Sequence, residues 1–297
     1  MAVANTVKAL QEAAQREILQ HHPCFNDEAH DNVGRVHLAI APRCNIQCSF
    51  CERNICANMR MQHPGWSAKV LSVTEAVGLV HSIISSGEKN FVVGVAGPGD
   101  PLANEETFQV LRLLQQEYPW LLKCLSTNGL LLEERLPQIL EAGIRALTVT
   151  VNTPDSTVGK NIYSWVRYRG RVYLGQEAAQ VLVTSQLRGI SKALDAGLSI
   201  KVNTVLIPGI NDQHVVRIAL LLKEAGVKLM NLIPLIPSGK MKDRPAPTCD
   251  ELRKARHDCE KILPQFRRCE HCRADIVYLP ENKQQANEIF QTPHICS

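Results

Sequence analysis

Helical and strand-like patterns alternate along most of the chain, and this limits the fold more than any other feature. Three helical patterns end alike, at Glu141-Ala142-Gly143, Asp195-Ala196-Gly197 and Glu224-Ala225-Gly226. Glycine is favoured just past a helix because it takes a left-handed conformation without steric cost. Repeated helix–strand units predict a parallel sheet covered by helices. The strands expected are 36–42, 91–95, 121–125, 146–151, 200–207 and 228–233, with helices at 74–86, 107–118, 131–142, 177–196 and 215–225.

This periodicity suits a doubly wound sheet nearly as well as a barrel. The positions of glycine-rich or polar segments distinguish these two folds. The segments, at 96–100, 126–129 and 152–153, follow the strands and not the helices. Ligands bind at the carboxyl ends of the strands in a barrel or partial barrel. We therefore predict an α/β fold, a partial (β/α)6 TIM-like barrel over residues 35–240. Extensions at 1–34 and 241–297 flank it.

Charge and hydropathy narrow the class of protein. The net charge is +4 without a long basic block, so composition gives no case for nucleic acid. No apolar run is long enough to span a bilayer, and residues 7–19 carry charges throughout, with apolar residues at helical spacing, unlike a signal peptide. A cytoplasmic location away from membranes is expected. The eleven cysteines of such a chain are better explained as metal ligands than as disulfides.

Three cysteines lie close together directly after the first expected strand. Cys44, Cys48 and Cys51 have the spacing C-x3-C-x2-C, with Phe50 before the last one. Three thiolates can hold three corners of a 4Fe-4S cube and leave the fourth iron open to a substrate. Structural zinc or buried free cysteines are the alternative, but zinc commonly takes two separated pairs. The loop resembles the signature of radical S-adenosylmethionine (SAM) enzymes, in which the open iron chelates SAM for cleavage to a 5′-deoxyadenosyl radical.

Residues that follow the other strands are candidates for binding SAM. The glycine-rich loop after the second strand occupies the place where this superfamily brings backbone close to the SAM amino group. Polar side chains near the ends of later strands could hydrogen-bond ribose or carboxylate, although capping and turn roles are the alternative for each. The candidates are Gly97, Pro98, Gly99, Asp100, Ser126, Asn128, Asn152 and Asn203.

Longer strings from His22 to Asp275 resemble the NifB family of nitrogenase cofactor biosynthesis proteins. The most specific are the run from Ala96 to Asn104 and the terminal Cys269-Glu270-His271-Cys272-Arg273-Ala274-Asp275. Others are His22-Pro23-Cys24, Cys124-Leu125-Ser126-Thr127-Asn128-Gly129 and Ile207-Pro208-Gly209-Ile210-Asn211-Asp212. The chain is similar to the family's stand-alone form, which lacks an accessory cofactor-carrier domain after the last cysteines.

The resemblance implies a maturase. Such proteins fuse two 4Fe-4S clusters, as substrates, into an 8Fe precursor of the nitrogenase cofactor. The central carbide comes from the methyl of one SAM, and a second SAM supplies the radical. The implied partners are a cluster donor, a cofactor-carrier or scaffold protein, and an electron donor such as a ferredoxin.

The same resemblance implies the ligands of the two substrate clusters. One set is His37, Cys56 and Cys124, and the other is Cys24, Cys269 and Cys272. Two alternatives remain open: a lone histidine in an apolar strand is commonly a packed core residue, and Cys-x2-Cys is a common zinc pattern. Cys249, Cys259 and Cys296 match no motif.

The chain also departs from the family. Met59 stands where an acidic residue is usual, and the stretch 60–69 differs from the usual pattern. Two other classes therefore stay open: a radical SAM enzyme that modifies a peptide or small molecule using auxiliary clusters, and a non-catalytic iron–sulfur or zinc carrier. Release of methionine and deoxyadenosine would separate the carrier from the two enzymes, and carbon transfer into a cluster would separate the enzymes from each other.

Overall fold

The computed structural model describes residues 13, 15–58, 65–268 and 272–280. Within these ranges a curved sheet of seven strands has the order β11-β10-β7-β6-β5-β1-β12. Neighbours from β11 to β1 are parallel, and β12 is antiparallel to β1. The strands are β1 Gly34–His37, β5 Phe91–Val95, β6 Lys123–Thr127, β7 Ala146–Thr150, β10 Ser199–Leu206, β11 Leu229–Pro234 and β12 Val277–Tyr278. The predicted six-stranded partial barrel is thus confirmed, with β12 added at one edge.

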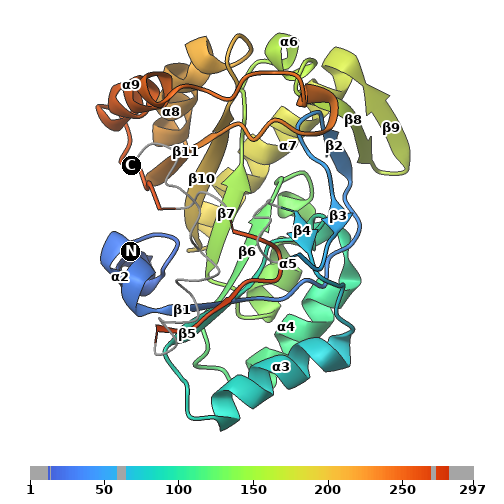
Figure 1. The fold of residues 1–297 in the computed structure, drawn as a ribbon, viewed down its shortest axis with the longest axis vertical. Helices are drawn as coiled ribbons and strands as arrows, with labels where there is room; N and C mark the ends of the chain where they lie inside the picture. Colours follow the sequence, from blue (N-terminus) through green and yellow to red (C-terminus); the bar gives the residue numbers. More distant parts are fainter. Residues whose placement is uncertain (1–12, 14, 59–64, 269–271, 281–297) are drawn as a thin grey trace, which may run out of the picture.

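Helices cover the outer side of this sheet (Figure 1). They are α2 Asp27–Asn32, α3 Val73–Ser85, α4 Glu105–Glu117, α5 Leu132–Glu141, α6 Ser156–Gly159, α7 Gly175–Asp195, α8 Val215–Glu224 and α9 Cys249–Glu260. Short 3-10 turns are η1 Pro101–Ala103, η2 Asp212–His214 and η3 Gly239–Met241. Residues 15–21 are helical, and the rest of the helix expected at 7–19 lies largely outside the described residues. Apolar residues of the sheet and of α3, α4, α5, α7, α8 and α9 form the main core, which includes Cys259 of α9.

Two strands differ by more than one residue from their predicted limits. The strand expected at 121–125 begins at Lys123, because Leu121 N–H bonds to Tyr118 O in a turn. Cys124 is therefore the second residue of β6 and Ser126 lies inside the strand, whereas both were expected at or past its end. The strand expected at 36–42 ends at His37, although Leu38 N–H still bonds to Gly94 O.

A hairpin that the helix–strand pattern did not predict holds the cysteine loop. β8 Tyr163–Tyr168 and β9 Arg171–Leu174 are antiparallel, and β8 also pairs with β2 Ile46–Cys48. A further small pair, β3 Asn54–Ile55 with β4 Trp66–Ser67, follows this loop along the chain. The cysteine loop is thus paired to the hairpin on one side, and Trp66 of β4 donates from Nε1 to the carbonyl of Glu52, next to Cys51, at 2.8 Å.

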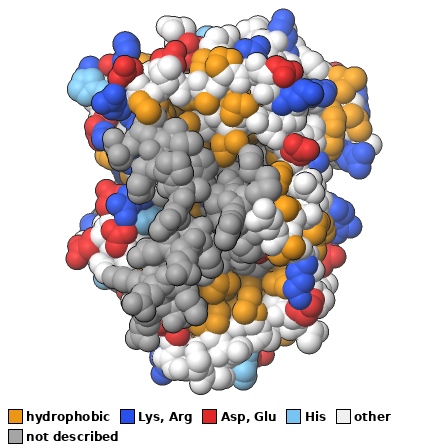
Figure 2. All heavy atoms as spheres, in the orientation of Figure 1, with side chains coloured by type: hydrophobic (Ala, Val, Ile, Leu, Met, Phe, Trp, Pro, Cys, Tyr) orange, Lys and Arg blue, Asp and Glu red, His pale blue; other side chains and the backbone are white. Residues whose placement is uncertain are grey.

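The surface carries charges of both signs. Figure 2 shows lysine and arginine side chains interspersed with acidic ones on the face drawn, in keeping with the net charge of +4. Hydrophobic side chains gather over the β8–β9 hairpin, where Val172 and Leu174 are 48% and 65% exposed. No helix in the described ranges is both long and apolar enough to cross a membrane.

Candidate functional site

A cavity of about 250 Å³ opens at the carboxyl ends of the parallel strands. The three loop cysteines line it together with nearly all the residues predicted to bind SAM, namely Pro98, Gly99, Asp100, Ser126, Asn128, Asn152 and Asn203. Gly97 does not line it: a Cβ there would approach Ala274 Cβ at 3.2 Å. The residues predicted from sequence thus lie around one space, which we call the first cavity.

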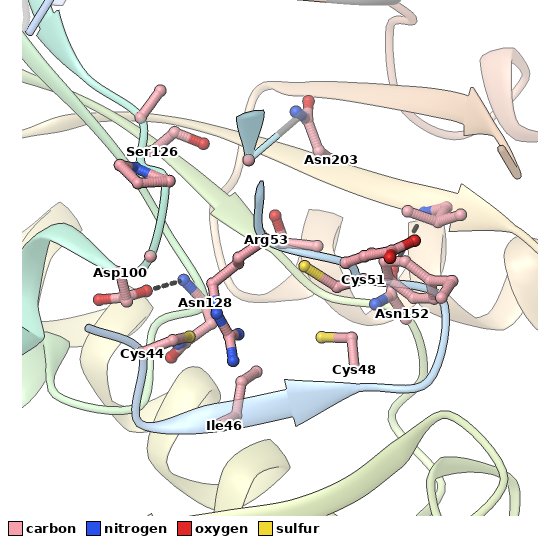
Figure 3. Close-up of a pocket in the computed structure, with 18 of the residues that line it drawn as sticks. Cys44, Ile46, Cys48, Cys51, Arg53, Asp100, Ser126, Asn128, Asn152 and Asn203 are labelled. Atoms are coloured by element: carbon pink, nitrogen blue, oxygen red, sulfur yellow. Dashed lines mark hydrogen bonds between the residues drawn. The ribbon is translucent and has the colours of Figure 1, made fainter. Parts of the chain in front are cut away.

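The cysteine loop presents its three sulfur atoms to the first cavity (Figure 3). Backbone bonds fix the loop to the hairpin, since Ser49 N–H donates to Ile162 O at 2.7 Å and Arg167 N–H donates to Asn45 O at 2.8 Å. Gln47 completes the turn by donating from Nε2 to Cys51 O at 2.8 Å. The sulfur positions therefore depend on strand pairing across more than a hundred residues of sequence.

Burial raises the pKa of all three thiols. It raises the pKa of Cys44 to about 12, holds that of Cys48 well above its ordinary value, and also raises that of Cys51. The Arg53 guanidinium acts against this shift at each of them. Without a metal the thiols are neutral at pH 7, and metal binding replaces their protons. A cationic iron–sulfur core thus provides the charge that this buried trio needs as thiolates.

Two further observations test whether a cluster fits. The loop cysteines are not in disulfides. Among the described residues, no three His, Cys, Asp or Glu side chains gather closely enough to hold a single metal ion. A cluster takes one thiolate on each of several irons, so its ligands stand further apart than those of one ion. Three free thiols that line one open cavity thus fit a 4Fe-4S cube with one iron left free.

The glycine-rich loop lies tightly against the cysteine loop. A Cβ on Gly99 would come within 2.2 Å of Arg43 O and 2.8 Å of Ala41 O. Gly99 N–H donates to Ala41 O at 2.5 Å. Only glycine allows these two backbones to meet, because any side chain would collide with backbone that cannot turn aside.

Asp100 has internal hydrogen-bond partners. Its carboxylate accepts from Thr127 Oγ1 at 2.9 Å, Asn128 N–H at 2.7 Å and Leu102 N–H at 3.0 Å. Burial nevertheless raises the pKa of Asp100 to about 6. These bonds tie the glycine-rich loop to the end of β6, so Asp100 positions the cavity wall.

The asparagines of the first cavity differ in their hydrogen-bond partners. Asn128 Nδ2 donates to Asn45 Oδ1 at 2.6 Å and approaches Cys44 Sγ at 3.8 Å, next to the cysteine loop. Asn152 Oδ1 accepts Val205 N–H at 2.9 Å, which joins β7 to β10. Asn203 lies inside β10 and not after it. Asn128 and Asn152 thus have structural bonds besides any contact with a ligand.

A second cavity of about 120 Å³ adjoins the first. Its walls include His37, Cys124, Cys24 and Cys272, which come from both predicted substrate-cluster sets. His37, Gly94 and Cys124 are paired in register on β1, β5 and β6, so the side chains at these three positions project from the same face of the sheet. Gly94 leaves open the space between the other two. The row could not be derived from sequence spacing, because it depends on strand register.

His37 has one ring nitrogen free for a ligand. Its Nδ1 lies 3.0 Å from Arg273 O, and a carbonyl only accepts, so Nδ1 carries the proton and Nε2 has a lone pair. Burial lowers the pKa of His37 to about 4, so the ring is neutral at pH 7. A neutral imidazole whose other nitrogen donates to a backbone carbonyl is the usual form of a metal-ligating histidine.

Arg273 connects the other predicted ligands. Besides accepting from His37, it donates from Nη2 to Cys56 O at 2.9 Å and from Nε to Asp275 Oδ1 at 2.9 Å. Its side chain is 1% exposed. Cys56 lies outside the lining of both cavities but is held to the same segment as Cys272. Cys269 and Met59 lie outside the described residues.

Sequence reasoning missed several residues that line the cavities. Tyr163 of β8 borders the first cavity, and His22 and Lys201 border the second. The run Tyr163–Leu174 alternates aromatic and polar residues around Arg169-Gly170, which is a hairpin signal that could have been recognised. Lys201 carries no such signal, because a single polar residue in an apolar strand does not reveal which face it occupies, and His22 lies in a loop just past a helix, where spacing does not show which way a side chain points.

Comparisons with known proteins show the superfamily to which the chain belongs. The family model of the radical SAM superfamily matches residues 38–222. Streptococcus suis SuiB bound to S-adenosylmethionine has a similar fold, with a TM-score of 0.58 at 11% identity over 89% of this chain and 56% of that one. The fold, the cysteine loop and the family match define a radical SAM enzyme.

Relatives narrow the class further. FeMo cofactor biosynthesis protein NifB of Methanocaldococcus jannaschii is 46% identical over 274 residues, which cover 92% of this chain and 91% of that protein. The protein of the same name from Chlorobaculum tepidum is 38% identical over 87% of this chain and 62% of its own length. The chain belongs to the NifB family.

Proposed function

We propose that this enzyme fuses two 4Fe-4S clusters with a SAM-derived carbide into the 8Fe precursor of the nitrogenase cofactor. The observation that carries the proposal is the contact between the two cavities. Ala96, Ser126, Asn203 and Ile233 line both, so a group bound in one faces the other. A radical formed from SAM in the first cavity would need to travel only across this shared wall.

The residues of the first cavity hold the radical machinery in this proposal. Cys44, Cys48 and Cys51 bind a 4Fe-4S cluster, which supplies the electron for reductive cleavage of SAM. The backbone of residues 97–99 and the side chains of Ser126, Asn128, Asn152 and Asn203 surround SAM. Asp100 holds the glycine-rich loop against β6 and contributes by position.

The second cavity receives the substrate clusters. His37, Cys56 and Cys124 form one ligand set, and Cys24, Cys269 and Cys272 form the other. Support comes from the neutral His37 ring with its free Nε2, and from four of these six residues lining a single space. Convergence of both sets is what fusion requires, because two clusters must meet to form one core.

The partners follow from this chemistry. The reaction consumes preformed clusters, electrons and SAM, and releases a large cluster that is unstable outside protein. We therefore propose a cluster donor, an electron donor such as a ferredoxin, and a cofactor-carrier or scaffold protein as partners in the cytoplasm. In this proposal the barrel spans residues 35–240. The segments that flank it, 1–34 and 241–297, each carry ligands of the substrate clusters.

Metal analysis of anaerobically reconstituted protein tests the cluster count. Three cubes predict about twelve irons per chain, with matching sulfide, at four irons each. Zinc in place of iron at the set of Cys24, Cys269 and Cys272 would overturn the second substrate site in favour of a zinc knuckle. Deoxyadenosine formation without carbon transfer would indicate a different radical SAM enzyme, and no SAM cleavage at all would indicate a carrier.

Pulsed EPR tests the histidine ligand. His37→Ala should remove nitrogen coupling from one cluster and stop methyl transfer, while the SAM-binding cluster remains. If the variant keeps both coupling and methyl transfer, or if it fails to fold, His37 is a core residue.

A further inference from the structure

Two buried polar groups in the second cavity have no role in the ligand sets. The Lys201 ammonium and the His22 ring both line this cavity, and both residues are 0% exposed. Lys201 Nζ and His22 Nε2 have no hydrogen-bond partner among the residues that the structure describes. Buried polar atoms in proteins are nearly always bonded, so this pair requires an explanation.

Lys201 is held in place by aromatic rings. Its Nζ lies 4.6 Å from the centroid of the Phe266 ring and 5.6 Å from that of Phe25. Cation–π contact stabilises an ammonium but does not satisfy its donors. No aspartate or glutamate is among the described residues that line the cavity, so its walls supply no carboxylate counter-ion. A buried, unpaired ammonium is costly and is kept where it meets an anion.

His22 is oriented as a donor. Cys24 N–H donates to His22 Nδ1 at 3.0 Å, so Nδ1 holds the lone pair and the proton is on Nε2. The ring packs edge-on against Phe25, with centroids 4.9 Å apart. The arrangement leaves Nε2–H, a fixed donor, without a partner in the described structure.

The geometry points to Lys201 and His22 as a recognition pair for an anionic iron–sulfur cluster, with the ammonium as counter-charge and His22 Nε2–H as donor to a cluster sulfide. The inference rests on the proposed function, because it takes the second cavity as the site of the substrate clusters. It goes beyond ligation, since neither residue binds iron. Both are positioning residues: they set how tightly a cluster is held and at what potential it is reduced.

The chemistry of the walls favours a cluster over a small anion. Cys24, Cys124 and Cys272 line the same space, and a core bound by three thiolates is net anionic. Its sulfides accept hydrogen bonds from N–H groups, and such bonds, like nearby positive charge, tune its reduction potential. The described walls of the cavity hold a lysine and an N–H donor but no carboxylate. Both groups would therefore favour the reduced, more negative cluster.

Lys201→Met in the full chain, reconstituted anaerobically, tests the ammonium. Methionine keeps the aliphatic length and the packing on the two rings but removes the charge. We expect iron to leave the cavity's cluster about tenfold faster in the presence of a chelator, because a charged contact is lost. The reduction potential of that cluster should fall by about 59 mV for each tenfold shift in its reduced fraction. The SAM-binding cluster and SAM affinity should not change.

Lys123→Met is the matched control. Lys123 is also 0% exposed, but it precedes Cys124 in β6, donates to Leu121 O at 2.9 Å and does not line the cavity. It should leave iron release and potential as in the unsubstituted protein. Equal effects of both lysine variants would mean that Lys201 acts through folding alone and would overturn the inference.

His22→Asn tests the donor separately. Asparagine Oδ1 can still accept Cys24 N–H, while the donor at the position of Nε2 is lost. We expect a fall in potential in the same direction as in Lys201→Met, with metal-free thermal stability near that of the unsubstituted protein.

If neither variant changes iron release or potential while the unsubstituted chain binds its clusters, the recognition pair is wrong and the proposed function stands. If the unsubstituted chain binds no cluster outside the cysteine loop, both fail. Weaker SAM binding in Lys201→Met would assign the lysine to SAM and also refute the pair.

Discussion

Gly94→Ala would place one methyl group on the wall of the second cavity, between His37 and Cys124. An alanine Cβ at this position would lie 3.1 Å from Cys124 Sγ, 3.1 Å from His37 Cδ2 and 3.5 Å from His37 Nε2. The first two separations are tighter than ordinary van der Waals contact, so both side chains must move apart. The backbone of Gly94 is ordinary strand, so alanine itself fits the local conformation.

The magnitude follows from these contacts. One extra methyl in a packed site costs about 1–3 kcal/mol, and for a chain of this size each kcal/mol lowers Tm by roughly 2–4 °C. The protein should therefore fold. The substrate cluster between His37 and Cys124 should be lost, however, because the methyl occupies the space between two of its ligands. Iron should fall from about twelve to about eight per chain, at four per cube.

The assay compares Gly94→Ala with Gly78→Ala, which replaces an exposed glycine in α3. No atom lies within 4 Å of a Cβ built at Gly78, so this control should be neutral or stabilising by about 0.5–1 kcal/mol. Iron content, nitrogen coupling in pulsed EPR and thermal unfolding would be measured on both. Full iron content with unchanged nitrogen coupling in Gly94→Ala would show that no cluster sits between His37 and Cys124.

Three further predictions follow from the site. Replacing the three loop cysteines by alanine should abolish deoxyadenosine formation and remove about four irons, one cube; SAM cleavage by the triple variant would disprove the radical site. Arg273→Met breaks a buried ion pair and should lower stability by about 3–5 kcal/mol in urea unfolding, with Asp275→Asn as the companion variant; an unchanged unfolding midpoint would contradict the link to Cys56. In metal-free protein, the pKa values of His22 and His37, lowered by burial to about 3 and about 4, predict that stability is full above about pH 6.5 and falls toward pH 4, because the unfolded chain binds protons first. Asp100, whose pKa is raised to about 6, opposes this trend below pH 6; a urea midpoint that rises as the pH falls from 6.5 to 4 would refute the histidine assignment.

The barrel and the cysteine loop were predictable because both are local patterns. Periodicity identified the six parallel strands, and three cysteines within eight residues identified the loop from which the first cavity grows. The polar segments after the strands pointed to the correct end of the sheet. These features depend on spacing along the chain, which a sequence states directly.

The second cavity was not predictable from spacing. The approach of His37 to Cys124 depends on the register of three strands, and the bond from His37 to Arg273 joins residues 236 positions apart. The β8–β9 hairpin carries a local turn signal, but its pairing with the cysteine loop is a tertiary contact that spacing along the chain does not give. Lys201 shows the same limit, since its value as a buried cation appears only when the walls around it are known.

Transfer of the SAM methyl carbon tests the central claim most directly. Reconstituted, reduced protein would be supplied with SAM labelled with ¹³C at the methyl group, and the cluster fraction released from the protein would be analysed for the label. The account predicts label in that fraction, together with S-adenosylhomocysteine and 5′-deoxyadenosine, and loss of all label incorporation in Gly94→Ala. Formation of methionine and deoxyadenosine with no label in any cluster would contradict it.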